Sequence, residues 1–188
     1  MTGVVLETAR LRLRRWLPRD RAPFAAMNAD PAVMDFPRPL TRAESDAEMA
    51  GFEARWDADG VSWAAAERKG DGVFVGMVGI ARCEMALPFC PCVEAGWRLP
   101  QAHWGHGYAT EAAMAWLAHG FAVLGLPEIV AFTDPGHAAS QAVMRKVGMR
   151  PDPSRDFQHP DMPVGHPLRP QVLWTISRAA WEEAGRPG

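Results

Sequence analysis

The feature that most constrains this chain is a strand, a glycine-rich turn, a helix and a second strand in close succession. Val93–Leu99 has the composition of a strand that Pro100 ends, and apolar residues at helical spacing predict a helix over Tyr108–Leu124. A short apolar run over Glu128–Thr133 predicts the next strand. Parallel strands need a long crossover, usually a helix, so this region predicts a parallel pair late in the chain and an α/β fold.

The rest of the chain alternates further strand and helix signals. Leu11 and Leu13 alternate with arginines, which is typical of a strand with one wet face. Thr41 and Glu44 form a capping box that predicts the start of a helix ending near Gly60. Five more elements are expected: a helix over 20–27, hairpin strands over 61–67 and 74–83, a helix up to Gly148 with Asp134 as N-cap and Pro135 at its first position, and a strand over 172–176.

The composition of the chain excludes several classes of protein. The chain of 188 residues is long enough for one domain. Its residues are 48% hydrophobic and 22% charged, and this composition excludes disorder for most of the chain. A net charge of −2 argues against broad nucleic-acid binding, and no apolar run is long enough for a membrane span. Three cysteines without a secretion signal predict reduced thiols in the cytoplasm. We therefore expect a single domain over 1–188, with its core over about 7–178, that binds neither nucleic acid nor membranes.

The turn between the first strand and the helix, Trp104–Tyr108, has the features of an anion site. Two glycines before a helix present backbone N–H groups at the positive end of the helix dipole and let a ligand approach the backbone closely. A tight turn made of small residues for packing would have the same sequence. A dinucleotide fingerprint needs a small residue where Thr110 stands, and the ending of a Walker loop is absent. The sequence of the turn therefore indicates either a phosphate site that is neither a dinucleotide site nor a Walker loop, or a turn whose small residues serve packing.

Three groups of residues carry a family resemblance. They are Glu7–Arg14 with Asp30–Met34, Val93–Pro100 with Trp104–Ala112, and Ser140–Met149. In this order they resemble the GNAT N-acetyltransferase superfamily, and more narrowly its branch of Rim-type acetyltransferases of ribosomal-protein N-termini. The resemblance spans nearly the whole chain. It implies a mixed, mostly antiparallel sheet of six to seven strands with flanking helices and a splayed wedge that binds acetyl-CoA.

The resemblance also implies roles for individual residues toward acetyl-CoA. The backbone of Trp97 and Leu99 would pair with the pantetheine arm, as an added strand does. His137 stands where the branch usually has asparagine, three residues before Ser140, and both would contact the cofactor. Trp104 occupies a position where the family usually has arginine or glutamine. The N–H groups that would hold the pyrophosphate belong to Gly105, His106, Gly107, Tyr108, Ala109 and Thr110.

The implied reaction is acetyl transfer to a primary amine by direct attack in a ternary complex. Glu94, on the cofactor strand, is the candidate base that takes a proton from the ammonium through water; a buried structural glutamate is the other interpretation. Many family members use a tyrosine near the last helix as general acid, but the only tyrosine here is Tyr108. Ser140, water or the thiolate itself would have to serve. These departures leave a second hypothesis, a non-catalytic acyl-CoA-binding regulatory module.

The remaining features are less specific. Cys83, Cys90 and Cys92 are too few and too irregularly spaced for a structural zinc site, so no metal is expected. The proline-rich segment over 151–170 is long for a compact domain, which is typical of a functional segment such as a substrate lid or of a disordered one. Acidic residues over 44–59 are interpreted as a solvated helix face. The acceptor stays open between protein N-termini and small-molecule amines, and a homodimer is common in the family.

Overall fold

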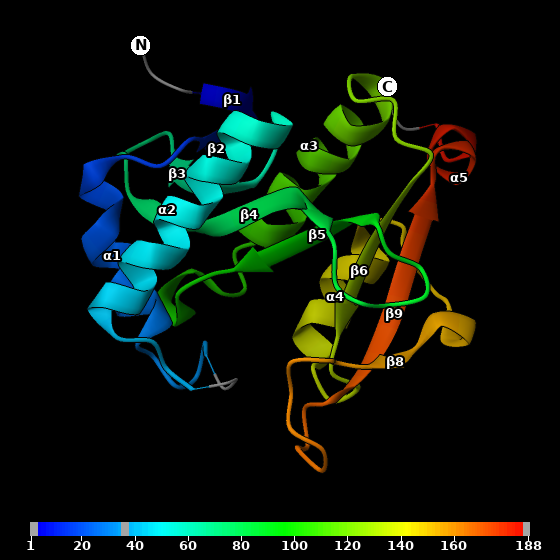
Figure 1. The fold of residues 1–188 in the computed structure, drawn as a ribbon. Coiled ribbons are helices and arrows are strands. Elements are labelled where there is room, and N and C mark those ends of the chain that lie inside the picture. The colour runs from blue at the N-terminus through cyan, green and yellow to red at the C-terminus, as the bar shows by residue number, and fades with distance from the viewer. Residues whose placement is uncertain (1–3, 35–37, 186–188) are drawn as a thin grey trace. The chain divides into compact units, whose positions relative to one another are not determined.

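The Gly70–Gly72 turn folds β3 (Trp63–Arg68) back along β4 (Phe74–Cys83) as an antiparallel pair, which confirms the predicted hairpin. β2 (Leu11–Arg14) pairs antiparallel with β3, and β1 (Val4–Glu7) with β2 (Figure 1). The alternating leucines of β2 are completely buried, as one covered face of a sheet requires. In this computed structural model the described residues are 4–34 and 38–185.

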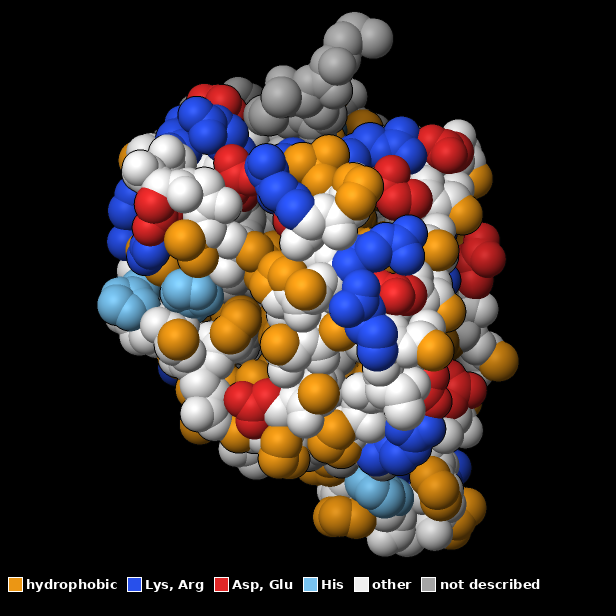
Figure 2. Space-filling model, turned by 90° about the vertical axis from the view of Figure 1, so that its left-hand side faces the viewer, with side chains coloured by type: hydrophobic (Ala, Val, Ile, Leu, Met, Phe, Trp, Pro, Cys, Tyr) orange, Lys and Arg blue, Asp and Glu red, His pale blue; other side chains and the backbone are white. Residues whose placement is uncertain are grey.

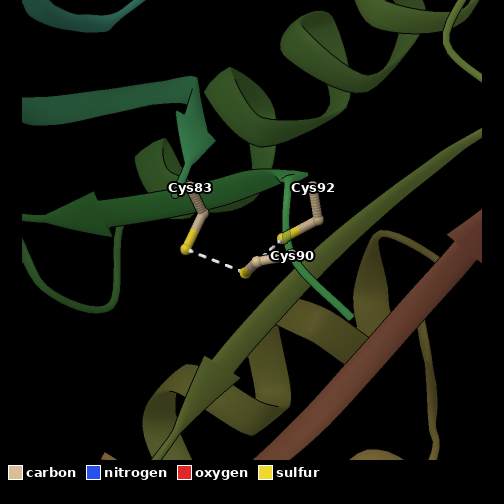
Figure 3. Close-up of side chains that lie close together, drawn as sticks. All are labelled: Cys83, Cys90 and Cys92. Atoms are coloured by element: carbon tan, nitrogen blue, oxygen red, sulfur yellow. Dashed lines mark hydrogen bonds between the residues drawn. The ribbon is translucent and has the colours of Figure 1, made fainter. Parts of the chain in front are cut away.

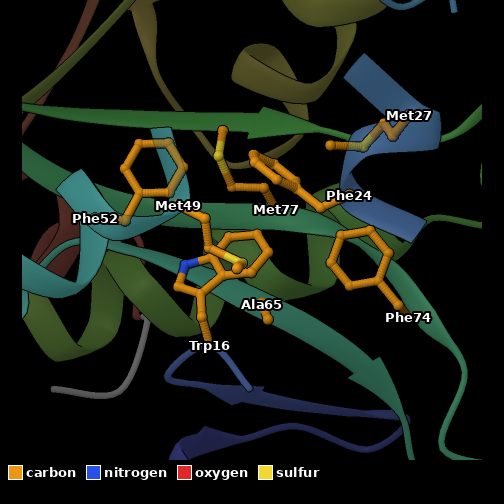
Figure 4. Packing of buried hydrophobic residues seen from close by; sticks show 8 residues of the cluster. All are labelled: Trp16, Phe24, Met27, Met49, Phe52, Ala65, Phe74 and Met77. Atoms are coloured by element: carbon orange, nitrogen blue, oxygen red, sulfur yellow. The ribbon is translucent and has the colours of Figure 1, made fainter. Parts of the chain in front are cut away.

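Two helices connect β2 to β3 and supply the core of this region. α1 (Arg21–Asn28) follows a 3-10 turn over Pro18–Asp20, and α2 (Arg42–Asp59) begins after the N-cap Thr41. The Thr41 hydroxyl accepts the Glu44 N–H and the Glu44 carboxylate accepts the Thr41 N–H, so the predicted capping box is confirmed. The buried side chains that pack together are Trp16, Phe24, Met27, Met49, Phe52, Ala65, Phe74 and Met77 (Figure 4).

The predicted parallel crossover is present. β5 (Cys92–Arg98), α3 (Tyr108–Ala122) and β6 (Glu128–Thr133) follow one another, and β5 pairs in parallel with β6 where Glu94 lies opposite Val130. β6 also pairs antiparallel with β9 (Pro170–Ser177) along its whole length. The three residues at the centre of β6 are buried, which agrees with its short apolar sequence.

The described residues form two compact units. The first unit is drawn from residues 1–79 and 96–115, and the second unit from residues 80–95 and 116–188. Strand order in the first unit is β1-β2-β3-β4-β5. In the second unit it is β4-β5-β6-β9-β7, with β8 beside β9. β4, β5 and α3 contribute residues to both units. Among the described residues no helix combines the length and the apolar character that a membrane crossing requires.

The number of strands differs from the expected six to seven. Within the described ranges the sheet has nine strands, because β7 (Arg150–Pro151) and β8 (Phe157–Gln158) each pair with β9 through only two residues. Both lie at or within the proline-rich segment, together with a 3-10 turn over Pro153–Arg155. Strands of two residues have no period for sequence to reveal. A final helix, α5 (Arg178–Glu183), capped by the Ser177 hydroxyl, was not expected either.

The start of α4 (Ala138–Lys146) also differs from the prediction. The Asp134 carboxylate accepts the Gly136 N–H and closes a turn ahead of the helix. The N-cap is His137, whose Nδ1 accepts the Ser140 N–H at 3.3 Å. The prediction that Asp134 caps this helix and that Pro135 occupies its first position is therefore wrong, because the aspartate satisfies a nearer backbone group.

Candidate active site

The predicted cofactor turn follows β5 in the first unit. A 3-10 turn over Gln101–His103 leads into it, and the backbone then passes through Gly105 and Gly107 with φ of 75° and 79°. Positive φ at both positions explains why glycine occupies them. The Gly107 carbonyl accepts the Glu111 N–H, so α3 begins directly out of the turn. Because the first N–H groups of a helix lack intrahelical acceptors, this end of α3 is suited to an anion.

Arg10 braces this turn from a distant part of the sequence. Its Nη1 donates to the His106 carbonyl at 2.9 Å, and its Nε donates to the Glu111 carboxylate at 2.6 Å. The Arg10 backbone N–H and the Thr8 hydroxyl donate to the other Glu111 oxygen, at 2.8 and 2.6 Å. The guanidinium carbon also lies 4.7 Å from the centre of the Tyr108 ring. Sequence reasoning missed this role, because Arg10 is one of several arginines on an alternating strand.

The Glu111 carboxylate gives this brace a testable pH dependence. Burial alone would raise the pKa of Glu111, but the hydrogen bonds from Thr8 and Arg10 outweigh it and hold the pKa below its ordinary value. A lowered pKa stabilises the folded chain above the ordinary pKa, and this contribution is lost as the pH falls through the lowered value. We expect Glu111→Gln to lower the melting temperature at neutral pH, and this difference from the parent protein to shrink below about pH 4.

Thermal unfolding followed by circular dichroism at several pH values measures this effect. The matched control is Glu183→Gln, because Glu183 is exposed at the end of α5. The control variant is expected to melt like the parent protein at every pH. A melting difference for Glu111→Gln that stays constant from neutral pH to acid would contradict the role assigned to the charged carboxylate.

Trp104 and Leu99 contact each other beside the strand that is predicted to bind pantetheine. The Trp104 indole Nε1 donates to the Leu99 carbonyl at 2.7 Å, and the Trp104 side chain is half exposed. One lone pair of this carbonyl is therefore used within the protein. Trp97 is half-buried in β5. Between these residues, the Arg98 guanidinium donates to Asn28 at 2.8 Å and to Glu48 at 3.1 Å.

Three other predicted residues lie in the second unit. Glu94 is half-buried in β5 at the position that pairs with Val130. His137 and Ser140 lie together at the start of α4. Because the His137 Nδ1 accepts the Ser140 N–H, a hydrogen bond from His137 to a cofactor would have to come from Nε2. The predicted site residues thus fall into a first-unit group over 97–110 and a second-unit group of Glu94, His137 and Ser140.

The second unit also holds a groove of about 760 Å³, and Gln141, the residue that follows Ser140, is one of its lining residues. Such a volume is typical of small-molecule sites. The proline-rich segment forms part of the wall, and Arg155 anchors it through ion pairs of 2.7 Å with Glu128 and with Asp152. The lining residues are Gln141, Arg145, Met149, Arg150, Pro151, Pro153, Asp156, Val172 and Trp174.

The acidic residues of α2 are paired with arginines. Arg15 lies 2.7 Å from both Glu53 and Asp57, and Arg42 lies 3.0 Å from Asp46. Figure 2, which faces the side where α1 and α2 lie in Figure 1, shows side chains of both signs interspersed over this face. These carboxylates therefore attract a cationic acceptor less than their number in the sequence indicates.

The three cysteines, for which no metal was expected, converge in the second unit. The Cys90 sulfur lies 3.7 Å from the sulfurs of both Cys83 and Cys92 (Figure 3). Their spacing along the chain looked irregular, but the connection between β4 and β5 brings them to one point.

Comparison with known proteins identifies the family. The Acetyltransferase (GNAT) domain family matches residues 10–150. The chain belongs to the GNAT acetyltransferase family. It is 36% identical to the uncharacterized protein YkkB of Bacillus subtilis (strain 168) over 146 residues, which are 77% of this chain and 84% of YkkB.

Solved structures agree with this assignment. The acetyltransferase of Agrobacterium tumefaciens str. C58 superposes with a TM-score of 0.73 at 27% identity, covering 91% of this chain and 92% of that one. RimJ of Mycobacterium smegmatis, in complex with CoA-disulfide, superposes with a TM-score of 0.70 at 22% identity, covering 94% and 90% of the two chains; this likeness shows the fold.

The GNAT assignment confirms the expected fold class and the expected kind of enzyme. The fold is α/β, with an open, mixed and mostly antiparallel sheet and flanking helices. The chain is an N-acetyltransferase. Its structural neighbours include proteins named RimJ and RimL at 22% and 13% identity, a likeness that shows the fold. The roles of individual residues stay predictions.

Proposed function

We propose that this GNAT enzyme transfers the acetyl group of acetyl-CoA to a primary amine by direct attack in a ternary complex. The observation that carries the proposal is the turn with positive φ at Gly105 and Gly107, which opens onto α3 and is braced by Arg10. The family uses acetyl-CoA, and the similar RimJ structure contains CoA-disulfide.

In this proposal the turn holds the donor through its backbone. N–H groups over 105–110 bind the pyrophosphate at the positive end of α3. The Arg10 guanidinium is bonded to Glu111 and to the turn carbonyl, so its part is to shape the turn. Trp97 and Leu99 pair with pantetheine through backbone groups, Leu99 through its N–H because its carbonyl accepts Trp104. His137 contributes a hydrogen bond from Nε2.

The chemistry needs a base, an acid and a place for negative charge. The amine lone pair attacks the thioester carbonyl, the C–N bond forms and the C–S bond breaks, and the CoA thiolate takes up a proton. Glu94 receives the ammonium proton through water, and the Ser140 hydroxyl or water donates a proton to the leaving CoA thiolate. A backbone N–H of the cofactor strand stabilises the oxyanion. Tyr108 does not serve as the acid in this scheme, because it belongs to the turn that is proposed to hold the pyrophosphate; its side chain is buried and its hydroxyl accepts a hydrogen bond from Arg68.

The proposal extends to the organisation and setting of the enzyme. Residues 1–188 form one catalytic domain with its core over 7–178, although residues 1–3, 35–37 and 186–188 lie outside the described part of the chain. The enzyme works in the cytoplasm, where its cysteines stay reduced. The acceptor is a protein N-terminus or a small-molecule amine. The proline-rich segment lies beside the part of the site where the acceptor binds. The homodimer common in the family stays a prediction.

Mass spectrometry of reaction mixtures tests the proposed function. The protein is incubated with acetyl-CoA and a mixed panel of N-terminal peptides, polyamines, amino acids and aminoglycosides. We expect one class of amine to gain one acetyl group, which also identifies the acceptor. If acetyl-CoA binds but no amine in the panel is acetylated, the regulatory acyl-CoA-binding alternative is favoured over the proposal.

A further inference from the structure

The three cysteines of the chain form one cluster at the ends of two neighbouring strands in the second unit. Cys83 is the last residue of β4, Cys92 is the first residue of β5, and Cys90 lies in the connection between them. The Cys90 sulfur lies 3.7 Å from each of the other two, and all three sulfurs lie within 4.8 Å of one another. Figure 3 shows the side chains pointing toward a common point.

These sulfur–sulfur distances match those around a thiolate-bound metal ion. For a metal–sulfur bond of about 2.3 Å, sulfurs at tetrahedral angles lie about 3.8 Å apart and sulfurs at trigonal angles about 4.0 Å apart. The observed distances extend from 3.7 Å to less than 4.8 Å. Shifts of a fraction of an ångström would therefore place three sulfurs around one ion.

Three thiolates select soft ions. Sulfur ligands favour Cu(I) and Zn(II) over hard cations such as Mg²⁺ and Ca²⁺. A trigonal set of sulfurs suits Cu(I), whereas Zn(II) completes a tetrahedron with a water or another fourth ligand. We propose that Cys83, Cys90 and Cys92 bind one soft d10 metal ion through three thiolates and thereby tie the 84–91 connection to the ends of β4 and β5.

The surroundings of the cluster favour three sulfurs bound to a metal ion over three thiolates without one. Cys83 is buried and the other two cysteines are half-buried. Hydrogen bonding with Cys83 and burial raise the pKa of Cys92, while burial and Cys83 raise the pKa of Cys90. The Glu94 carboxylate adds like charge near Cys90. On binding, each thiol releases its proton to solvent as its sulfur bonds the ion, and the positive ion offsets the crowded negative charge.

Metal titration of the reduced protein tests this site. The full-length chain is stripped of metal and reduced without oxygen, and its three thiols are counted. One arm then receives Zn(II) and the other Cu(I), each in competition with a chromophoric chelator. We expect one ion per chain in at least one arm, and the arm that binds identifies the ion. X-ray absorption of the loaded protein is expected to show sulfur neighbours at about 2.3 Å.

Serine variants separate this site from adventitious binding. Cys90→Ser is the first choice because Cys90 is half-buried, whereas Cys83 is buried. We expect it to lose at least about 100-fold in affinity, since even second-shell changes cost 10–100-fold. The ion is also expected to raise the melting temperature of the parent protein but not of Cys90→Ser. Glu183→Gln, which changes an exposed potential ligand outside the cluster, is the matched control and is expected to bind the ion like the parent.

Three results would overturn the proposal. The first is that the parent protein binds neither ion more tightly than a variant with all three cysteines replaced by serine. The second is an absorption spectrum dominated by nitrogen or oxygen neighbours, which needs no variant and so applies even where a serine variant fails to fold. The third is a disulfide between two of the cysteines that persists after reduction. None of these results depends on acetyl transfer, so failure of the metal site leaves the proposed function intact.

Discussion

Gly107→Val is expected to weaken acetyl-CoA binding by about 100-fold or more. Gly107 has φ of 79°, where a β-branched side chain is strained by about 1–3 kcal/mol. A Cβ at this position would lie 3.5 Å from Nη2 of Arg10, an ordinary van der Waals contact, so the expected effect comes from the backbone strain. If the turn moves, the N–H groups that are proposed to hold the pyrophosphate lose their alignment, and each 1.4 kcal/mol lost is tenfold in affinity. Isothermal titration with acetyl-CoA measures the effect.

Gly60→Val provides the matched control for backbone strain. Gly60 ends α2 with φ of 71°, and a Cβ there would meet nothing within 4 Å. The control therefore has comparable strain at a position outside the proposed site. We expect it to lower the melting temperature while leaving the affinity for acetyl-CoA unchanged. If Gly107→Val folds and binds acetyl-CoA as tightly as the parent protein, the turn is not the phosphate site.

Glu94→Gln is expected to lower kcat by 10²- to 10⁴-fold, the range that a general base contributes. Glutamine has nearly the same shape and can still form hydrogen bonds, but it cannot take up the ammonium proton. The affinity for acetyl-CoA is expected to stay unchanged, since the proposed contacts of the donor do not include Glu94. Steady-state kinetics at saturating donor, with the acceptor that the amine panel identifies, separates kcat from KM.

Glu84→Gln is the matched control for this carboxylate. Glu84 is exposed and directly follows β4, so its loss changes the charge near β5 without removing the proposed base. We expect this variant to keep its kcat. Full activity in Glu94→Gln would eliminate Glu94 as the base. A fall in melting temperature with normal kcat would instead assign Glu94 the structural role that a half-buried glutamate can have.

Local rules predicted the elements whose signals are themselves local. The capping box of Thr41 and Glu44 lies within one helical turn, and the structure contains it. The bounds of β4 and β6 coincide with those expected, because each is a mostly apolar run between turn residues. The glycine turn is recognisable because positive φ excludes other residues at 105 and 107.

Features that depend on long-range contacts could not be predicted in this way. The brace between Arg10 and Glu111 joins residues 101 apart in the sequence, and nothing in the alternation of arginines and leucines over 10–14 distinguishes Arg10 from the other arginines. The sulfur cluster depends on how the 84–91 connection folds. At α4, the local rule chose the wrong N-cap, because Asp134 accepts the Gly136 N–H ahead of the helix while His137 accepts the Ser140 N–H inside it.

The measurement that tests the central claim most directly follows the fate of an isotopically labelled acetyl group. The enzyme is mixed with acetyl-CoA labelled in the acetyl group and with its amine acceptor, and intact protein and product are weighed by mass spectrometry during a single turnover. Direct attack in a ternary complex predicts that the label passes to the amine while the protein stays unlabelled. A protein that acquires the label before the product does, or an amine that never acquires it, would contradict the proposed mechanism.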